Sequence, residues 1–130
     1  MSLTTISSEE ILNQKSIVKM LDDDIVYVYY EESSVLDVSD FKESLEAYSE
    51  ISQGRRLKVL SEFGEFSTAS MEAMKFGQTI DLNASAEAMV FKSLAQRLLL
   101  RFFNTFRKQK HPLKFFQSKE KAIQWIKSLD

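Results

Sequence analysis

The stretch SIVKMLDDDIVYVYYE, residues 16–31, decides the fold, because it places two runs of strand composition on either side of a turn. SIVKML and IVYVYYE are rich in β-branched and aromatic residues and have the length of strands. The three consecutive aspartates between them, Asp22, Asp23 and Asp24, are typical of a turn. A calcium loop would need further spaced ligands and a glycine, so we interpret the aspartates as a solvated turn. The pattern therefore predicts a β-hairpin.

Beyond the hairpin, segments with the period of a helix alternate with segments of strand composition. VSDFKESLEAYSEI places Phe41, Leu45 and Tyr48 on one helical face. Either Ser39 or Asp40 is expected to cap this helix. The expected elements after the hairpin are helix 38–51, strand 57–63, helix 67–80, strand 87–93, helix 93–110, strand 113–117 and a last helix capped by Ser118. This order predicts an α/β fold with a mixed five-stranded sheet, an N-terminal hairpin followed by β-α repeats, covered by about four helices.

Residues 16–130 are expected to form a single domain, since a chain of this size buries one hydrophobic core. For residues 1–15 the pattern leaves a loose arm, a short helix capped by Ser7 and an extra edge strand open. The composition, 44% hydrophobic and 28% charged, is that of a folded globular protein. The sequence contains no long apolar run and no secretion signal, so we expect no transmembrane segment and a cytoplasmic location. The absence of cysteine excludes disulfides, thiolate catalysis and cysteine-based metal sites.

Charge is distributed unevenly along the chain. Residues 1–91 hold 17 acidic and 7 basic side chains, a net charge of −10, whereas residues 92–130 hold 2 acidic and 10 basic ones, a net charge of +8. Four bases fall on one half of the helix predicted at 93–110, opposite a half made of leucine and phenylalanine; we call them the basic stripe: Arg97, Arg101, Arg107 and Lys108. Four charges contribute only about 4 kcal/mol toward an anionic membrane. The aromatic residues lie on the core side, so a nucleic acid is not the expected partner either.

Catalysis finds little support in the sequence. The only histidine, His111, precedes Pro112 and is interpreted as a solvated turn residue rather than as a catalytic base. The three glycines are isolated, so no phosphate-binding loop is present. We therefore expect no catalytic residue, no metal site, no cofactor and no enzyme.

The C-terminal half carries a family resemblance. AMVFKSLAQRLLLRFF followed by HPLKFFQSKEKAIQWI resembles the C-terminal half of bacterial STAS-like domains, in particular the SpoIIAA-like branch. A strand, a long helix, a strand preceded by proline and an A-x-x-W helix recur there, and the resemblance extends from residue 16 onward. Relatives of this superfamily bind anti-sigma factors, belong to anion transporters or are suggested to bind lipids. The resemblance thus implies a STAS-like fold and a non-enzymatic binding or regulatory module. Phe116 and Trp125 are expected to lie in its core.

The resemblance also implies a candidate phosphorylation site. Regulatory members of the superfamily carry a phosphorylated serine in a D-S-S-G-like segment, and FGEFSTASMEA occupies the matching place. This segment keeps Ser67, Thr68 and Ser70 but lacks the Asp-Ser-Ser-Gly sequence. A hydroxyl at the start of a helix is also explained by N-capping, which stabilises by about 1 kcal/mol.

A ligand site is expected where the parallel strands end and the helices begin. Five residues are predicted to gather at this edge and to suit a phosphate, sulfate or carboxylate of a partner: Ser67, Thr68, Lys92, Ser93 and Arg97. Ser93 together with Gln96 forms a capping box in the sequence.

The leading functional expectation is a module that acts through protein–protein interaction, and a homodimer is left open. The alternative is a carrier of a lipid or another apolar small ligand in a cavity between the sheet and the helices. An exposed apolar patch would favour the first function, and an enclosed pocket lined by phenylalanine and methionine would favour the second.

Overall fold

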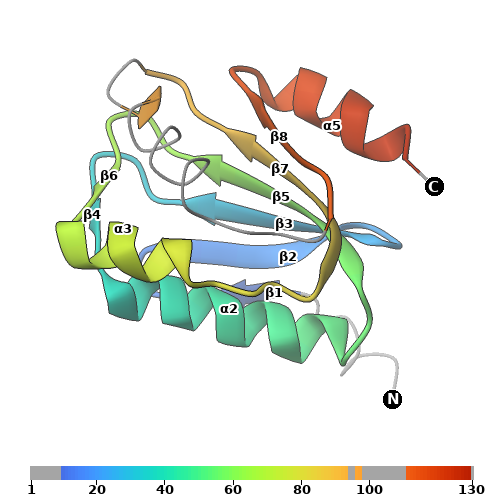
Figure 1. The fold of residues 1–130 in the computed structure, drawn as a ribbon, viewed down its shortest axis with the longest axis horizontal. Helices are drawn as coiled ribbons and strands as arrows, with labels where there is room; N and C mark the ends of the chain where they lie inside the picture. The colour runs from blue at the N-terminus through green and yellow to red at the C-terminus, as the bar shows by residue number, and fades with distance from the viewer. Residues whose placement is uncertain (1–9, 94–95, 98–110, 130) are drawn as a thin grey trace.

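A mixed six-stranded sheet forms the centre of the described part of the molecule (Figure 1). The computed structural model describes residues 10–93, 96–97 and 111–129. In order across the sheet, its strands are β1 (Glu10–Leu12), β2 (Ser16–Asp22), β3 (Ile25–Tyr30), β5 (Leu57–Phe63), β7 (Ala84–Val90) and β8 (Leu113–Phe116). The first three strands pair antiparallel, whereas β3, β5, β7 and β8 are parallel neighbours. The predicted α/β class and the predicted hairpin are confirmed.

Three helices lie within the described residues: α2 (Val38–Ser52), α3 (Met71–Gln78) and α5 (Lys119–Lys127). In Figure 1, α2 and α3 lie on one face of the sheet and α5 lies on the other. A separate pair of short parallel strands is formed by β4 (Val35–Leu36) and β6 (Thr68–Ala69). The helix predicted at 93–110 lies almost wholly outside the described residues. None of the described helices is long and apolar enough to cross a membrane.

The sheet has six strands where the sequence pattern predicts five. The additional strand is β1, which pairs antiparallel with β2 so that Ile11 lies opposite Val18. Residues 10–12 therefore form an edge strand, which is one of the three possibilities left open for residues 1–15. Three residues are too few to show a strand period in the sequence. Hydrogen bonding to the open edge of β2 and the packing of Ile11 against the core stabilise them as a strand.

The helix α2 begins earlier than the expected caps imply. Its N-cap is Asp37, rather than Ser39 or Asp40. The Asp37 backbone N–H donates a hydrogen bond to Asp40 Oδ2 at 2.8 Å, so the carboxylate of the first turn reaches back to the helix start. Asp40 is only 3% exposed and also forms an ion pair with Lys15 at 3.5 Å.

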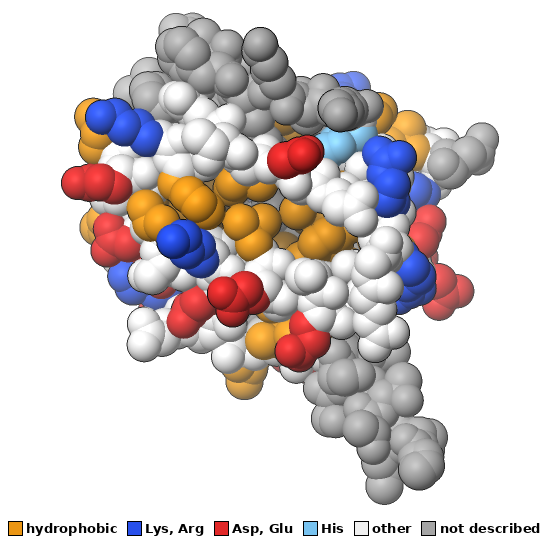
Figure 2. All heavy atoms as spheres, turned by 60° about the horizontal axis from the view of Figure 1, so that its bottom comes forward, with side chains coloured by type: hydrophobic (Ala, Val, Ile, Leu, Met, Phe, Trp, Pro, Cys, Tyr) orange, Lys and Arg blue, Asp and Glu red, His pale blue; other side chains and the backbone are white. Residues whose placement is uncertain are grey.

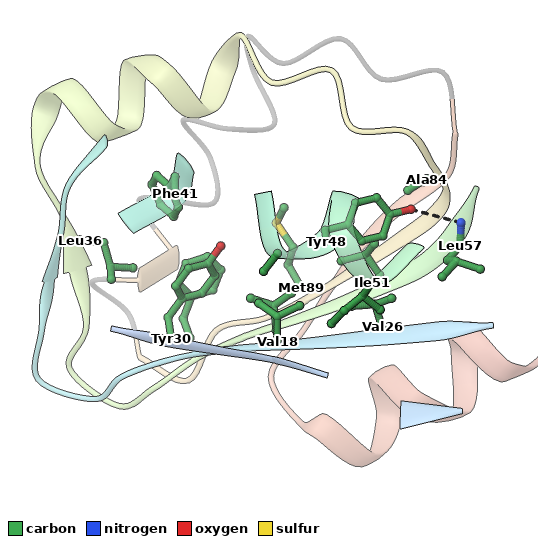
Figure 3. Packing of buried hydrophobic residues seen from close by; sticks show 14 of the residues in the cluster. Val18, Val26, Tyr30, Leu36, Phe41, Tyr48, Ile51, Leu57, Ala84 and Met89 are labelled. Carbon is green, nitrogen blue, oxygen red and sulfur yellow. Dashed lines mark hydrogen bonds between the residues drawn. The ribbon is translucent and has the colours of Figure 1, made fainter. Parts of the chain in front are cut away.

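Two apolar clusters fill the two faces of the sheet. On the α2 face, three aromatic rings from neighbouring parallel strands stack in a row, with ring centroids 4.8 Å apart for Tyr30 and Phe63 and 4.7 Å apart for Phe63 and Phe91. Figure 3 shows this larger cluster, with Phe41 and Tyr48 of α2 lying over the sheet. The α5 face holds the smaller cluster.

The core positions expected for Phe116 and Trp125 are corrected by the structure. Both side chains are only partly buried, and they pack at the margin of the smaller cluster with ring centroids 5.7 Å apart. The fully buried residues of α5 are Ala122 and Ile126. A nine-residue helix turns only a narrow stripe toward the sheet, which places Trp125 at the edge of that stripe.

Candidate functional site

A cavity lies over the centre of the sheet, on the face that α2 covers. Its floor consists of side chains from three parallel strands: Val28 of β3, Val59, Ser61 and Phe63 of β5, and Glu87 and Met89 of β7. These side chains share one face because directions alternate along a strand, and because Ser61 lies opposite both Val28 and Met89 in the register of the sheet. Ser61 therefore occupies the middle of a mostly apolar floor.

The helix α2 and the segment after α3 enclose the cavity. Phe41, Leu45 and Tyr48 of α2 form one wall, and Ile80 and Leu82 close the cavity from the other side. Figure 3 shows Phe41, Tyr48 and Met89 between the helix and the sheet. The cavity has a volume of about 70 Å³. This volume holds one small functional group rather than a whole ligand, since a water molecule occupies about 30 Å³ in the liquid.

A larger groove adjoins the cavity on its outer side. The groove has a volume of about 380 Å³ and shares four lining residues with the cavity: Leu45, Tyr48, Ile80 and Leu82. Figure 2 views this side of the molecule and shows hydrophobic side chains at the bottom of a hollow. A third hollow of about 370 Å³, which Leu82 also lines, holds Arg56 and His111. The cavity and the groove together are large enough for a small amphipathic molecule.

The hydroxyl groups around the cavity differ in their hydrogen bonding. Ser44 Oγ and Tyr30 Oη lie 2.8 Å apart, and Ser44 Oγ also donates to the carbonyl of Phe41 at 2.9 Å. The Tyr48 hydroxyl donates to the carbonyl of Asn83 at 2.6 Å. Ser61 is 9% exposed, and among the described residues its hydroxyl has no hydrogen-bond partner.

Tyr48 is held neutral by its surroundings. Its hydroxyl accepts a hydrogen bond from the backbone N–H of Leu57 at 3.2 Å (Figure 3). Burial raises the pKa of Tyr48; the bond from Leu57 opposes this effect, and the nearby Glu87 carboxylate adds to it. The net pKa lies above its ordinary value, so Tyr48 stays a hydroxyl at neutral pH and fixes α2 against the residues that flank the cavity.

A buried acid–histidine pair lies at one end of the cavity floor. His111 Nε2 lies 2.5 Å from Glu87 Oε2, and the two side chains are only 5% and 3% exposed. The interpretation of His111 as a solvated turn residue is therefore wrong. The Glu87 backbone N–H donates to the carbonyl of Pro112 at 2.9 Å, which holds the turn against β7 and buries the imidazole. The signal that was missed is an acidic residue inside the apolar strand, since a buried carboxylate requires a partner.

The predicted edge of the sheet gathers around Gln96. The amide of this fully buried residue donates to Gly64 O at 2.7 Å, to Ser67 O at 3.1 Å and to Ser67 Oγ at 3.1 Å. Its carbonyl accepts from Lys92 N at 2.8 Å, and its own backbone N–H donates to Ser93 Oγ at 3.2 Å. The capping interaction expected between Ser93 and Gln96 is therefore present in one direction, while the glutamine side chain binds one residue earlier than a regular capping box requires.

Lys92 is engaged in an ion pair within the fold. Its Nζ lies 2.8 Å from Glu62 Oε2, while Tyr27 donates to Glu62 Oε1 at 2.5 Å. Burial alone would raise the pKa of Glu62, but the hydrogen bonds from Lys92 and Tyr27 outweigh burial and lower it. The bond to Glu62 raises the pKa of Lys92, and burial together with the bond to Glu62 raises the pKa of Tyr27. The charge of Lys92 is thus largely satisfied by Glu62.

The hydroxyls of the candidate phosphorylation segment occupy different environments. Ser67 is 1% exposed and donates to the carbonyl of Gly64 at 2.8 Å. Thr68 is exposed on β6. Ser70 is the N-cap of α3, because its Oγ accepts from Ala73 N at 3.1 Å. The capping role expected for this segment is confirmed at Ser70, and α3 begins later than predicted because the preceding residues form β6.

Of the remaining predicted residues, Arg97 lies within the described part of the chain. Arg97 is exposed. The rest of the basic stripe, Arg101, Arg107 and Lys108, lies outside the described residues. In the described ranges, no group of three or more acidic or histidine side chains is placed to hold a metal ion.

The comparisons with known proteins identify a family for this chain. No curated protein matches the chain. A solved structure, a protein with unknown function from Arthrobacter sp. FB24, is similar at 18% identity with a TM-score of 0.33, over 92% of this chain and 98% of that one. Residues 19–130 match the family model described as Domain of unknown function (DUF7793). Because this match spans most of the sequence, the chain belongs to the DUF7793 family.

Proposed function

We propose that this protein is a non-enzymatic binding module that takes up a small, largely apolar molecule between the sheet and α2. The observation that carries the proposal is the cavity over the sheet, which continues into the outer groove. Phe41, Phe63 and Met89 line the cavity, as expected for the ligand-carrier alternative. A polar group of the ligand fits the inner cavity, and its apolar part fits the groove.

The energetics of such binding are modest. Burying one CH₂ group stabilises a complex by about 0.8 kcal/mol, so a six-carbon chain gains about 4–5 kcal/mol before other terms. This range corresponds to a dissociation constant of about 0.2–1 mM for a minimal probe. A natural ligand that also filled the outer groove would bind more tightly.

The arrangement of polar groups supports binding rather than catalysis. A serine nucleophile requires a base within hydrogen-bond reach. Among the described residues, Ser61 makes no hydrogen bond to His111, whose Nε2 is directed at Glu87. The absence of enzymatic activity nevertheless stays a prediction.

The proposal is tested by methyl NMR of protein labelled at the methionine methyl groups. Titration with 1-hexanol is expected to shift the Met89 methyl resonance, because Met89 lines the cavity. The resonance of Met71, which is 56% exposed, serves as the internal control. A Met89 resonance that does not move at about 20 mM 1-hexanol would contradict the proposal.

A matched pair of variants locates the binding. Val59→Phe adds a ring to the cavity floor and is expected to weaken hexanol binding at least about 10-fold, since the new side chain fills the cavity. Val35→Phe makes the same change at a position that is 56% exposed, and is expected to leave binding unchanged. Equal binding by both variants would place the probe elsewhere. Native mass spectrometry of the purified protein would then show whether a ligand is retained.

Protein–protein interaction is the second candidate function, and exposed apolar side chains favour it. Val35, Phe66 and Met71 are 56%, 69% and 56% exposed on or beside the short strands β4 and β6. Phe66 also has a φ of 63°, which is uncommon for a residue other than glycine. If these side chains form a homodimer contact, sedimentation will show a dimer that Phe66→Ser abolishes. Leu12→Ser, on the edge strand β1, would not change the dimer. The resemblance to STAS-like domains and the cytoplasmic location stay predictions.

A further inference from the structure

We propose that the Ser61 hydroxyl is the polar anchor of this site, and that the ligand is an uncharged molecule with a hydroxyl or carbonyl oxygen on an apolar body. This inference rests on the proposed function and specifies its ligand class. It begins from the hydrogen bonding of the buried serines.

Ser61 differs from the other buried serines of the described residues. Each of the other four has a side-chain hydrogen bond at its hydroxyl, namely Ser16, Ser44, Ser52 and Ser67. Ser61 is nine-tenths buried, lies on a central strand and lines the cavity, yet within the described ranges its Oγ has no partner. The Ser61 hydroxyl borders the cavity, so an oxygen atom of a ligand can form a hydrogen bond with it in place of water.

The position of Ser61 suits an anchor. It lies between Val28 and Met89 in the sheet register, so a group bonded to it is surrounded by apolar side chains. The Tyr48 hydroxyl is directed to the carbonyl of Asn83, and Ser44 is directed to the carbonyl of Phe41. Among these hydroxyls, the one at Ser61 is therefore available for a ligand.

The charges of the lining exclude an acidic headgroup. Of the described residues that line the cavity, none is lysine, arginine or histidine, and one is the acid Glu87. A carboxylate buried here would have no countercharge among these lining residues and would bear the cost of losing its hydration. A neutral hydroxyl or carbonyl avoids this cost and still forms a hydrogen bond with Ser61.

The test compares three probes with the same six-carbon chain: 1-hexanol, 1-chlorohexane and hexanoate. Dissociation constants are measured from the Met89 methyl resonance in the wild type, in Ser61→Ala and in Ser52→Ala. We expect Ser61→Ala to weaken the binding of 1-hexanol about 3- to 10-fold, which is the effect of losing one hydrogen bond. The dissociation constant of 1-chlorohexane should change less than about 2-fold. Ser52→Ala removes a hydroxyl that lines the outer groove and is already hydrogen-bonded to the protein. This variant leaves the ratio of the dissociation constants of 1-hexanol and 1-chlorohexane unchanged. Hexanoate binds at least about 10-fold more weakly than 1-hexanol.

The outcomes separate the anchor from the proposed function. If both uncharged probes bind and Ser61→Ala weakens them equally or not at all, the anchor is refuted while the cavity remains a binding site. The same conclusion follows if hexanoate binds as tightly as 1-hexanol. If neither uncharged probe shifts Met89, the proposed function itself fails. Far-UV circular dichroism of Ser61→Ala checks that the fold is retained, as expected for a hydroxyl that makes no internal hydrogen bond.

Discussion

Gln96 connects the segment that follows β7 with the turn at residues 64–67, which lies 29 to 32 residues away in the sequence, so replacing it with alanine is expected to destabilise the whole domain. Its side chain is fully buried and bonds to Gly64, to Ser67 and to the backbone of Lys92. In Gln96→Ala, Gly64 O keeps its bonds from Ser67 N and Ser67 Oγ. The Lys92 N–H and the Ser67 carbonyl both lose the glutamine side chain as a partner.

The magnitude follows from these two groups. Each buried polar group left without a partner costs about 1–3 kcal/mol. The higher helix propensity of alanine offsets this loss by a few tenths of a kcal/mol. We therefore expect the free energy of unfolding of Gln96→Ala to fall by about 2–6 kcal/mol. With a urea slope of about 2 kcal/mol per molar, the midpoint would shift by about 1–3 M. Circular dichroism and the fluorescence of the single tryptophan, Trp125, report the transition.

A second glutamine provides the control. Gln124 is exposed on α5, and Gln124→Ala is expected to change the free energy of unfolding by less than about 0.5 kcal/mol. If Gln96→Ala unfolds within about 0.5 kcal/mol of the wild type, Gln96 does not carry the buried hydrogen bonds described above. The reasoning about this edge of the sheet would then be refuted.

Three further predictions concern charge, backbone space and the smaller cluster. Because the pKa of Glu62 is lowered from 4.5 in the folded protein, its ionised carboxylate stabilises the fold above that pH. This stabilisation is lost as pH falls through the folded-state pKa. In urea unfolding between pH 3 and 6, the free energy of unfolding should therefore decrease less with falling pH in Glu62→Gln than in the wild type. Glu72→Gln, at an exposed position, should show the same pH dependence as the wild type. Gly64→Ala should cost more than about 3 kcal/mol in thermal denaturation, since its Cβ would lie 2.5 Å from a backbone nitrogen. Gly54→Ala, with φ at 84° and open space around it, should cost only about 1 kcal/mol, and equal melting temperatures of the two glycine variants would contradict this contrast. Trp125→Ala should lower stability by about 2–3 kcal/mol, less than for a fully buried tryptophan, and an unchanged urea midpoint would show that its packing on the smaller cluster is unimportant.

Much of the fold could be predicted from local pattern. The run of β-branched and aromatic residues in 16–31 predicted the hairpin, and the switch to a helical period at Phe41 predicted the crossover that makes the next strands parallel. Strand β5 has the bounds that its pattern predicts, because all seven of its residues are buried and its ends are marked by a change of composition. The late start of α3 was not predictable in this way, since the residues before it pair as β6 with the distant strand β4. The edge strand β1 was only one of the possibilities left open for residues 1–15, because three residues are too few to show a strand period.

The candidate site could be predicted only in part. Ser67, Lys92 and Ser93 were expected near one edge of the sheet, and the structure brings them together around Gln96. Their hydrogen bonds and the ion pair of Lys92 are directed at the protein itself, which the residue types alone do not reveal. A serine or a lysine has the same sequence signature whether its polar atoms are satisfied internally or open to a ligand.

The sequence by itself determined the class of fold, because the hydrophobic period and the composition of each segment are local properties that can be recognised without knowledge of the tertiary contacts. Only the tertiary structure decided where the cavity lies and which polar groups are buried there. His111 is buried against Glu87 although 24 residues separate them. Within the described residues the Ser61 hydroxyl has no hydrogen-bond partner, and the residues opposite it, Val28 and Met89, are apolar. Both facts depend on the registers of the strands in the sheet. Those quantities result from packing over the whole core, so no short stretch of the sequence contains them.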